Sequence, residues 1–212
     1  MVVDETADLD RAARSMIQGA SYDNNLLCIA EKEVFVVDSV FDSLMNAMER
    51  AGAARLNSQE IDRLTSAAMI QVGEDNHDAP SKECLGQDAA RLAQFAGRQV
   101  PAGTELVFGE TDEHHPFVSV EQMMPFLPFV RCRNVDEAIQ KAKHYEHGFR
   151  HTSIIHSHDV RNMTRMGRIM DTTLFVKNGP CMASLGLGGE GYLSFSIACL
   201  LYTSPSPRDS DQ

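Results

Sequence analysis

Residues 126–176 read FLPFVRCRNVDEAIQKAKHYEHGFRHTSIIHSHDVRNMTRMGRIMDTTLFV. Three apolar runs typical of strands alternate here with two amphipathic segments typical of helices: strands over 126–131, 152–156 and 173–176, and helices from Asn134 and over 159–170. Asn134 with Glu137 three residues later matches a helix N-terminal capping pattern. Strands alternating with helices of this length predict an α/β fold with an at least partly parallel sheet.

The same alternation extends through the N-terminal half of the chain. The apolar spacing predicts these elements: the end of a strand at 1–4, a strand at 33–37, a strand at 105–109, and helices over 7–19, 39–51, 58–70 and 86–95. Ser39 and Asp42 give a capping signal for the second of these helices. Asn76 to Ser81 is expected to form a polar loop, and Tyr192 to Ile197 a strand.

Composition excludes several classes of protein. The chain has 212 residues, 43% hydrophobic and 23% charged, as in ordinary globular proteins, and its net charge of −11 makes it a poor nucleic-acid binder. No stretch reaches the roughly 18 apolar residues of a membrane helix, and the first twenty residues lack the features of a secretory signal. Five cysteines without a CxxC pattern favour a reduced, cytoplasmic protein.

Cys28 is the first candidate for chemistry. It lies in YDNNLLCIAEK, between a predicted helix and a predicted buried strand, where a scaffold can hold a reactive group rigidly. Nearby backbone N–H groups and Lys32 could stabilise a thiolate that attacks a carbonyl. On the local sequence alone, however, a buried cysteine that acts only as a small hydrophobic residue explains the pattern better.

Glu121 is the second candidate, in VEQMMPFLPF. An isolated carboxylate before an apolar, proline-marked stretch can accept two hydroxyl hydrogen bonds from a ribose. The alternative is an ordinary solvated loop carboxylate.

Two other patterns suggest binding sites but lack the expected context. The histidines at 114, 115, 144, 147, 151, 156 and 158 raise the possibility of a metal site, yet no HExxH or matching acidic pattern accompanies them. Gly186 to Gly191 is glycine-rich, but a strand-like segment follows it where a dinucleotide-binding loop opens a helix. We therefore expect scattered histidines and a flexible glycine loop.

Three longer segments carry a more specific signal. They are VVDETADLDRAARSMIQGASYDNNLLCIAEKEVFVVDSV from residue 2, HHPFVSVEQMMPFLPFVR from residue 114 with NVDEAI soon after, and LFVKNGPCMASLGLGGEGY from residue 174. In this order they resemble the C-terminal half of an aldehyde dehydrogenase of the coenzyme-A-acylating type. The resemblance is greatest to the acetaldehyde and propionaldehyde dehydrogenases of bacterial microcompartments. The stretch from Leu56 to Val100 contributes little to it.

The resemblance implies roles for both candidates. Cys28 matches the family's nucleophile, and Glu121 matches the glutamate that hydrogen-bonds the nicotinamide ribose. Hydrolytic aldehyde dehydrogenases usually carry Gly-Gln-x-Cys, whereas Asn25-Leu26-Leu27 precedes Cys28 here. This difference favours the acylating branch over the hydrolytic alternative. Asn178 falls where the family's chain returns to the cleft, and we assign it no role.

The implied reaction converts a short-chain aldehyde, NAD and coenzyme A into acyl-CoA and NADH through a cysteine thioester. The implied partners are a small aldehyde and coenzyme A, without nucleic acid or membrane. The resemblance also implies a homo-oligomer in the cytoplasm or in the lumen of a microcompartment shell. A non-enzymatic assembly subunit with the same fold is a further alternative.

The resemblance also predicts a truncated aldehyde-dehydrogenase-like catalytic domain that lacks most of the Rossmann cofactor domain. The expected parts are a trailing edge of the cofactor domain at 1–19, the catalytic domain at 20–185, a segment returning toward the cofactor domain at 186–197, and an adapter-derived, non-native tail at 198–212. The tail contains LLYTSPSPRDS, which resembles translated sequencing adapter. We expect no turnover by this chain alone.

Overall fold

A computed structural model describes residues 1–74 and 76–190. Its main feature is a seven-stranded sheet in the order β3-β6-β7-β2-β1-β8-β9, in which every neighbouring pair is parallel. The strands of this sheet are β1 (Val2–Val3), β2 (Val34–Val37), β3 (Ala54–Arg55), β6 (Val107–Thr111), β7 (Phe126–Cys132), β8 (Thr152–His156) and β9 (Leu174–Lys177). The predicted α/β fold with a parallel sheet is therefore confirmed.

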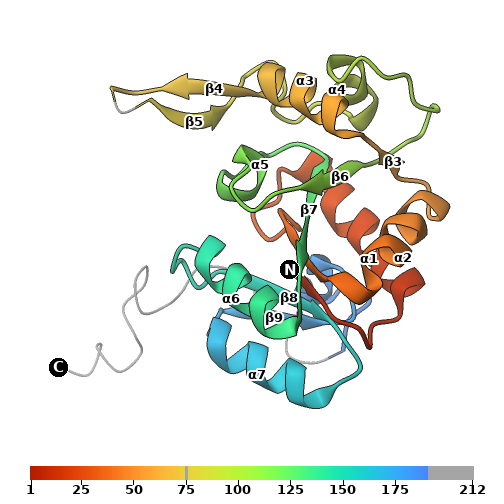
Figure 1. Ribbon diagram of the computed structural model, residues 1–212, viewed down its shortest axis with the longest axis vertical. Coiled ribbons are helices and arrows are strands. Elements are labelled where there is room, and N and C mark those ends of the chain that lie inside the picture. The colour runs from red at the N-terminus through yellow and green to blue at the C-terminus, as the bar shows by residue number, and fades with distance from the viewer. Residues whose placement is uncertain (75, 191–212) are drawn as a thin grey trace.

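Helices cover both faces of this sheet (Figure 1). They are α1 (Leu9–Ser21), α2 (Asp38–Arg50), α3 (Ser58–Ala68), α4 (Ala89–Phe95), α5 (Pro116–Ser119), α6 (Val135–Tyr145) and α7 (Val160–Met170), with 3₁₀ turns η1 (Tyr22–Asn25) and η2 (Cys181–Leu185). One buried cluster joins α1 and α2 to the sheet, and another joins α6 and α7 to the opposite face. A third cluster lies under α3 and α4.

Side-chain caps explain where several helices begin. Asp8, Asn57, Asn134 and Asp159 each accept a hydrogen bond from a backbone N–H of the first turn, and Asn57 forms a full capping box with Glu60. Such caps satisfy N–H groups that have no partner within the helix. The capping pattern predicted at Asn134 is confirmed. The signal at Ser39 and Asp42 was wrong, because α2 begins directly after β2 without a side-chain cap.

The expected polar loop at Asn76 to Ser81 was also wrong. Strand β5 (His77–Pro80) pairs antiparallel with β4 (Met69–Val72), so this segment forms half of a hairpin that projects from the body of the protein (Figure 1). Ile70, which fits the apolar spacing of the preceding helix, lies in β4 instead. Strand pairing across a turn overrides a local periodicity as short as this one.

The first nineteen residues belong to the same sheet as the rest of the chain. Strand β1 lies between β2 and β8, Val3 packs into the α1–α2 cluster, and Val2 packs into the α6–α7 cluster. Residues 1–19, expected at the trailing edge of a cofactor domain, therefore share their core with the predicted catalytic domain. The segments 191–197 and 198–212 lie outside the described residues.

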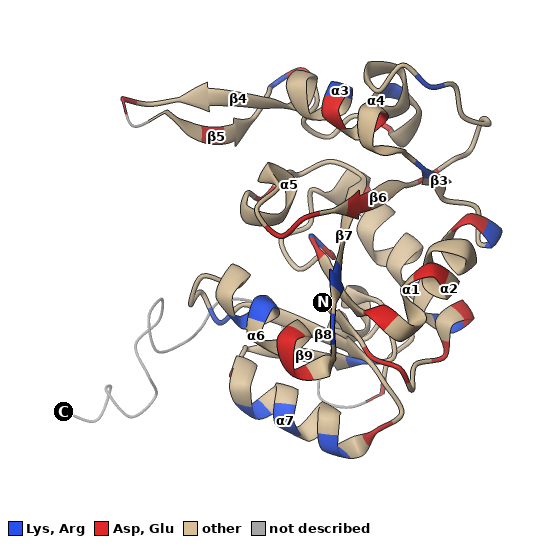
Figure 2. Ribbon diagram, viewed as in Figure 1, with Lys and Arg blue, Asp and Glu red and all other residues tan. Residues whose placement is uncertain are grey.

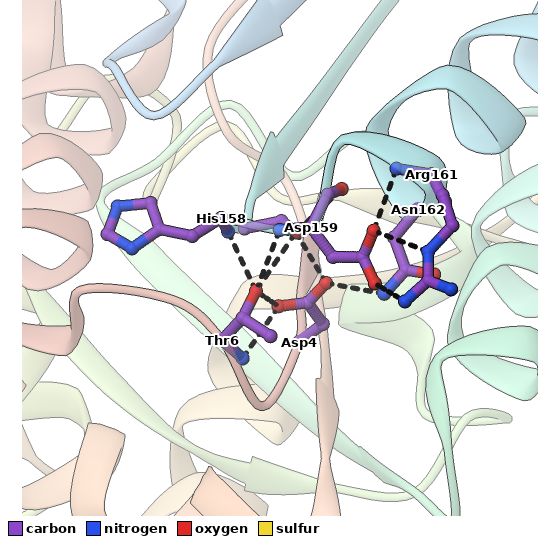
Figure 3. A network of polar contacts seen from close by, with 7 residues as sticks. Asp4, Thr6, His158, Asp159, Arg161 and Asn162 are labelled. Carbon is purple, nitrogen blue, oxygen red and sulfur yellow. Dashed lines mark hydrogen bonds and ion pairs between the residues drawn. The ribbon is translucent and has the colours of Figure 1, made fainter.

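A buried polar network fixes the carboxyl end of β1 (Figure 3). Asp4 is fully buried, and its carboxylate accepts hydrogen bonds from Thr6, from Ser157 Oγ at 2.6 Å and from Asn162 Nδ2 at 2.9 Å. Thr6 Oγ1 in turn accepts the backbone N–H groups of His158 and Asp159. The network thus joins the ends of β1 and β8 to the start of α7.

We expect Asp4→Ala to lower the free energy of unfolding by about 2–4 kcal/mol, because it leaves the buried Ser157 hydroxyl and the partly buried donors of Thr6 and Asn162 without their acceptor. Urea denaturation at pH 7 measures the loss. Asp10→Ala is the matched control: its ion pair with Arg50 is 62% exposed on both sides and should be worth less than about 1 kcal/mol. Equal losses in the two variants would show that the network contributes nothing beyond a surface pair.

Candidate active site

A cavity of about 530 Å³ lies at the amino ends of the central strands. Cys28 precedes β2, Glu121 precedes β7 and His151 precedes β8, and all three line this cavity. Because the strands are parallel, residues that precede neighbouring strands meet at one edge of the sheet. The two residues singled out by the sequence, Cys28 and Glu121, therefore share one cavity.

An unusual turn leads to Cys28. Asp23, Asn24 and Asn25 have φ values of 49°, 51° and 64°, so three successive residues without glycine adopt the left-handed conformation. Asparagine and aspartate tolerate this region better than other residues, which explains this run of residue types. The Asn25 side chain is buried, and its Nδ2 donates to the carbonyls of Ala20 at 2.8 Å and Glu31 at 2.9 Å. The turn is thus held in place from both sides.

Cys28 differs from the other cysteines that the structure describes. Its side chain is exposed, whereas Cys84, Cys132 and Cys181 are buried. Burial raises the pKa of the Cys132 thiol to about 11 and also raises the pKa values of Cys84 and Cys181. Within residues 1–74 and 76–190, Cys28 is the cysteine placed to react with a molecule in the cavity. The alternative of a buried hydrophobic cysteine does not describe it.

Lys32 and Glu121 form an ion pair at the cavity wall. Lys32 Nζ lies 3.4 Å from Glu121 Oε1 and donates to Asn25 O at 2.8 Å and Asn25 Oδ1 at 2.6 Å. Burial lowers the pKa of Lys32, while the charges of Glu121 and Cys28 oppose that shift. The Glu121 side chain is 54% exposed, which leaves its carboxylate accessible. Buried Gln122 donates to the carbonyls of Lys32 at 2.9 Å and Phe126 at 3.0 Å and so fixes the segment that carries Glu121.

Histidines contribute to the cavity in a way that the sequence reasoning missed. His147 and His151 line it, and burial lowers the pKa of His151. The sequence did contain one signal for His151, which directly precedes a predicted strand. Glu121 similarly lies shortly before another predicted strand. The remaining histidines lie elsewhere, and no group of three metal-ligating side chains occurs among the described residues.

The glycine-rich segment after η2 has a packing role in the described structure. Gly186 and Gly188 have φ values of 88° and 76°, and a Cβ on Gly189 would lie 2.6 Å from the carbonyl of Ala183. The described glycines therefore let the chain turn tightly against η2. Asn178 exchanges two hydrogen bonds with the backbone of Ser157 at the opposite end of the sheet from the cavity.

Basic residues gather on α7 (Figure 2), and none of these residues lines the cavity. Arg161 pairs with Asp159 at 3.0 Å, and Arg165 pairs with Asp136. Two of the three arginines of α7 are thus neutralised, so the helix presents little free positive charge. No helix among residues 1–74 and 76–190 has the length and apolar character needed to cross a membrane.

A parallel α/β sheet with an exposed cysteine and an accessible carboxylate in one cavity is typical of an enzyme's catalytic domain. The chain belongs to the aldehyde dehydrogenase family, whose model matches residues 1–190. The family expected from the sequence is therefore confirmed.

The similar proteins include acylating enzymes. The chain is 47% identical over 197 residues to acetaldehyde dehydrogenase (acetylating) EutE of Salmonella typhimurium. The propionaldehyde dehydrogenase of Rhodopseudomonas palustris, solved with bound CoA and an acylated cysteine, superposes with a TM-score of 0.86 at 40% identity. An engineered glycolyl-CoA reductase with bound NADP⁺ superposes with a TM-score of 0.87 at 39% identity.

These matches cover most of this chain but less than half of each relative. The chain spans 42% of the length of the Salmonella enzyme, while 93% of this chain is aligned. It spans 47% of the Rhodopseudomonas chain and 46% of the reductase chain, with 99% of this chain covered in both cases. The chain therefore spans less than half of the length of the relatives it matches.

Proposed function

We propose that this chain supplies the catalytic cysteine of a coenzyme-A-acylating aldehyde dehydrogenase, which converts a short-chain aldehyde into acyl-CoA with reduction of NAD. The observation that carries the proposal is the shared cavity of Cys28 and Glu121. The similarity to an acetylating enzyme and to a propionaldehyde dehydrogenase with bound CoA supports this choice of substrates.

Cys28 acts as the nucleophile. Its thiolate adds to the carbonyl carbon of the aldehyde and forms a tetrahedral thiohemiacetal, whose oxyanion the Cys28 backbone N–H stabilises. An oxyanion donor of this kind typically contributes about 10²–10³ in rate. Loss of hydride from the former aldehyde carbon leaves a thioester on Cys28. The thiolate of coenzyme A then attacks this thioester, releases acyl-CoA and restores the Cys28 thiolate.

Glu121 holds the nicotinamide ribose. Its accessible carboxylate offers oxygen acceptors at the cavity wall, which suits a pair of vicinal hydroxyl groups. The nicotinamide, when bound, accepts the hydride. The protein's contribution at this point is to orient the ribose relative to Cys28.

Coenzyme A, rather than water, completes the reaction in this proposal. Exchange between two thioesters is nearly balanced in free energy, so the second step needs no base that activates water. The sequence before Cys28, Asn25-Leu26-Leu27, also differs from the usual hydrolytic pattern. A hydrolytic dehydrogenase that releases the free acid is the alternative.

Product analysis tests the choice between these two functions. Because this chain alone is expected not to turn over, a full-length enzyme that contains this sequence is incubated with propionaldehyde and NAD, with and without coenzyme A, and the products are separated by chromatography. The acylating function predicts multiple turnovers that give propionyl-CoA and NADH in equal amounts when coenzyme A is present, and at most one equivalent of NADH per active site without it. Propionate that forms equally with and without coenzyme A would identify the hydrolytic function.

The organisation of the working enzyme forms part of the same proposal. The catalytic domain comprises residues 20–185 together with β1 and α1, which share its core, and the cofactor-binding Rossmann domain lies in regions of the relatives beyond the matched part. The enzyme is a homo-oligomer in the cytoplasm or inside a microcompartment shell. Gel filtration and fractionation of the producing cells test these two points.

A further inference from the structure

Gln122, the residue after Glu121, is fully buried at the amino ends of β2 and β7. Its Nε2 donates to the carbonyl of Lys32 at 2.9 Å and to the carbonyl of Phe126 at 3.0 Å. Lys32 lies between Cys28 and β2, whereas Phe126 is the first residue of β7, and these two strands are neighbours in the sheet. The Gln122 amide therefore bridges the segment that carries the cysteine and the segment that carries Glu121.

The hydrogen bonds of this amide are only partly satisfied. Gln122 Oε1 is buried and has no hydrogen-bond partner among the described residues. A buried acceptor without a partner costs free energy that an apolar side chain of the same size would not cost. Exchanging the oxygen and nitrogen of the amide would not remove this cost, because the oxygen would then face two carbonyl oxygens. A buried polar group that violates the usual rule in this way is typical of a functional site.

The turn after Gln122 is also held in an unfavourable conformation. Met123 has a φ of 47°, in the left-handed region that residues other than glycine rarely adopt. Its carbonyl accepts the backbone N–H of Gly86 at 3.0 Å, and the carbonyl of Gly86 accepts a hydrogen bond from Asn24 Nδ2 at 2.9 Å. Asn24 belongs to the left-handed turn before Cys28, so Gly86 provides a second bridge between the same two segments. Strained backbone that surrounding contacts impose is typical of sites that need a fixed geometry.

We infer that Gln122 is a positioning residue, which holds Glu121 in a fixed place relative to Cys28 so that hydride can pass from the thiohemiacetal carbon to the nicotinamide. The inference rests on the proposed function, because it takes Glu121 as the site of the nicotinamide ribose. In this step the thiohemiacetal is oxidised to the thioester and loses its hydroxyl proton, while NAD is reduced to NADH. The step depends on both segments, since Cys28 holds the carbon and Glu121 holds the ribose.

The transfer of an acyl group from acyl-CoA to Cys28 depends on the first segment alone. Asn25 anchors that segment separately, through hydrogen bonds from its Nδ2 to the carbonyls of Ala20 and Glu31. Loss of the Gln122 amide should therefore impair hydride transfer and leave acyl transfer intact. Damage to the whole fold would instead impair both half-reactions.

A full-length enzyme that contains this sequence allows both half-reactions to be measured. Gln122→Met replaces the amide with an apolar side chain of similar size that donates to neither carbonyl. It should slow the formation of NADH from propionaldehyde in a single turnover by about tenfold to hundredfold, as expected for a displacement of about 1 Å. The rate at which free CoA is released from propionyl-CoA should stay within about threefold of the wild-type rate.

A second variant tests the role of the two hydrogen bonds. Gln122→Glu keeps the shape of the side chain, and its buried carboxyl, when protonated, can donate one hydrogen bond instead of two. Its rate of NADH formation should lie between those of wild type and Gln122→Met, and it provides the same comparison if Gln122→Met does not fold. The matched control is Gln94→Met, which removes an exposed glutamine of α4 and should change neither half-reaction.

Hydrogen exchange of this chain gives a readout that needs no activity. In Gln122→Met the backbone amides of residues 118–125 should exchange about threefold faster or more, while those of α2 keep their wild-type rates. Unchanged exchange, unchanged hydride transfer or an equal loss of both half-reactions would overturn the inference. A wild-type full-length enzyme that forms no NADH would reject the proposed function, and the exchange rates would still decide whether Gln122 holds the segment that carries Glu121.

Discussion

Replacing Cys28 with serine is expected to reduce the rate at which free CoA is released from propionyl-CoA by about 10³-fold or more, because the hydroxyl is a far weaker nucleophile than a thiolate. The reaction is the reverse of the proposed final step: the Cys28 thiolate attacks propionyl-CoA, binds the propionyl group and expels coenzyme A. It needs no nicotinamide. Wild-type protein should therefore release up to one equivalent of CoA, detected with a thiol reagent.

A second cysteine variant provides the control for this experiment. Cys132→Ala removes a thiol that is buried and whose pKa is raised to about 11, so the release of CoA should match wild type. If Cys28→Ser protein released CoA as fast as wild type, another nucleophile would be responsible. If both variants lost the activity together, the loss would reflect folding rather than chemistry.

Two buried ionisable groups should give opposite pH dependences of stability. Burial raises the pKa of Glu31 to about 7, and burial with the nearby Arg11 charge lowers the pKa of His156 to about 4. Between pH 4.5 and 7, Glu31 carries a proton in the folded protein but not in the unfolded chain. The stability that Glu31 contributes is therefore lost as pH rises from 4.5 to 7. His156 has the opposite behaviour, since it is protonated in the unfolded chain but not in the folded protein between pH 4 and 6.5. The stability that His156 contributes is therefore lost as pH falls from 6.5 to 4. Each amounts to about 3 kcal/mol.

The variants Glu31→Gln and His156→Gln separate the two contributions. Between pH 4.5 and 7, the free energy of unfolding of Glu31→Gln should rise relative to wild type by about 3 kcal/mol. Between pH 4 and 6.5, that of His156→Gln should fall relative to wild type by a similar amount. Urea denaturation at several pH values measures both, with exposed Glu49→Gln as the control. A pH-independent difference between wild type and Glu31→Gln would contradict the burial of an ionisable Glu31.

The position of Glu31 also explains a glycine inside a helix. Gly19 lies in α1, and a Cβ at this position would come within 2.0 Å of the Glu31 carboxylate. Glu31 Oε1 accepts the backbone N–H of Cys181 at 3.0 Å. The Glu31 carboxylate thus connects α1, the segment after Cys28 and η2. Gly19, which makes room for this carboxylate, is the only feature of the sequence that indicates the contact.

Local patterns predicted the alternating elements because each depends on neighbouring residues. The strand at Thr152 to His156 follows from a short apolar run, and the helix after Asn134 follows from a cap and a periodic face. The hairpin from Met69 to Pro80 was missed because it depends on strand pairing, which a single-segment pattern does not reveal. The position of β1 in the middle of the sheet was missed for the same reason, since two residues carry no periodicity.

The candidate site was predictable only in part. Cys28 and Glu121 were candidates from their local sequence, and the resemblance gave them roles. Their presence in one cavity follows from the order of the parallel strands. The fixed geometry of Lys32 was not predictable, because it depends on the left-handed conformation of Asn25 and on the distant segment that carries Glu121. Contacts of this kind arise only when residues far apart in the chain are brought together.

The central claim is that Cys28 forms the acyl-enzyme thioester, and locating the acyl group tests it most directly. The protein is incubated with propionyl-CoA, quenched in acid and digested, and every cysteine peptide is examined by mass spectrometry. The account predicts a single propionyl group on Cys28 that is released by added coenzyme A. A propionyl group on another cysteine, or an unmodified Cys28 after prolonged incubation, would contradict it.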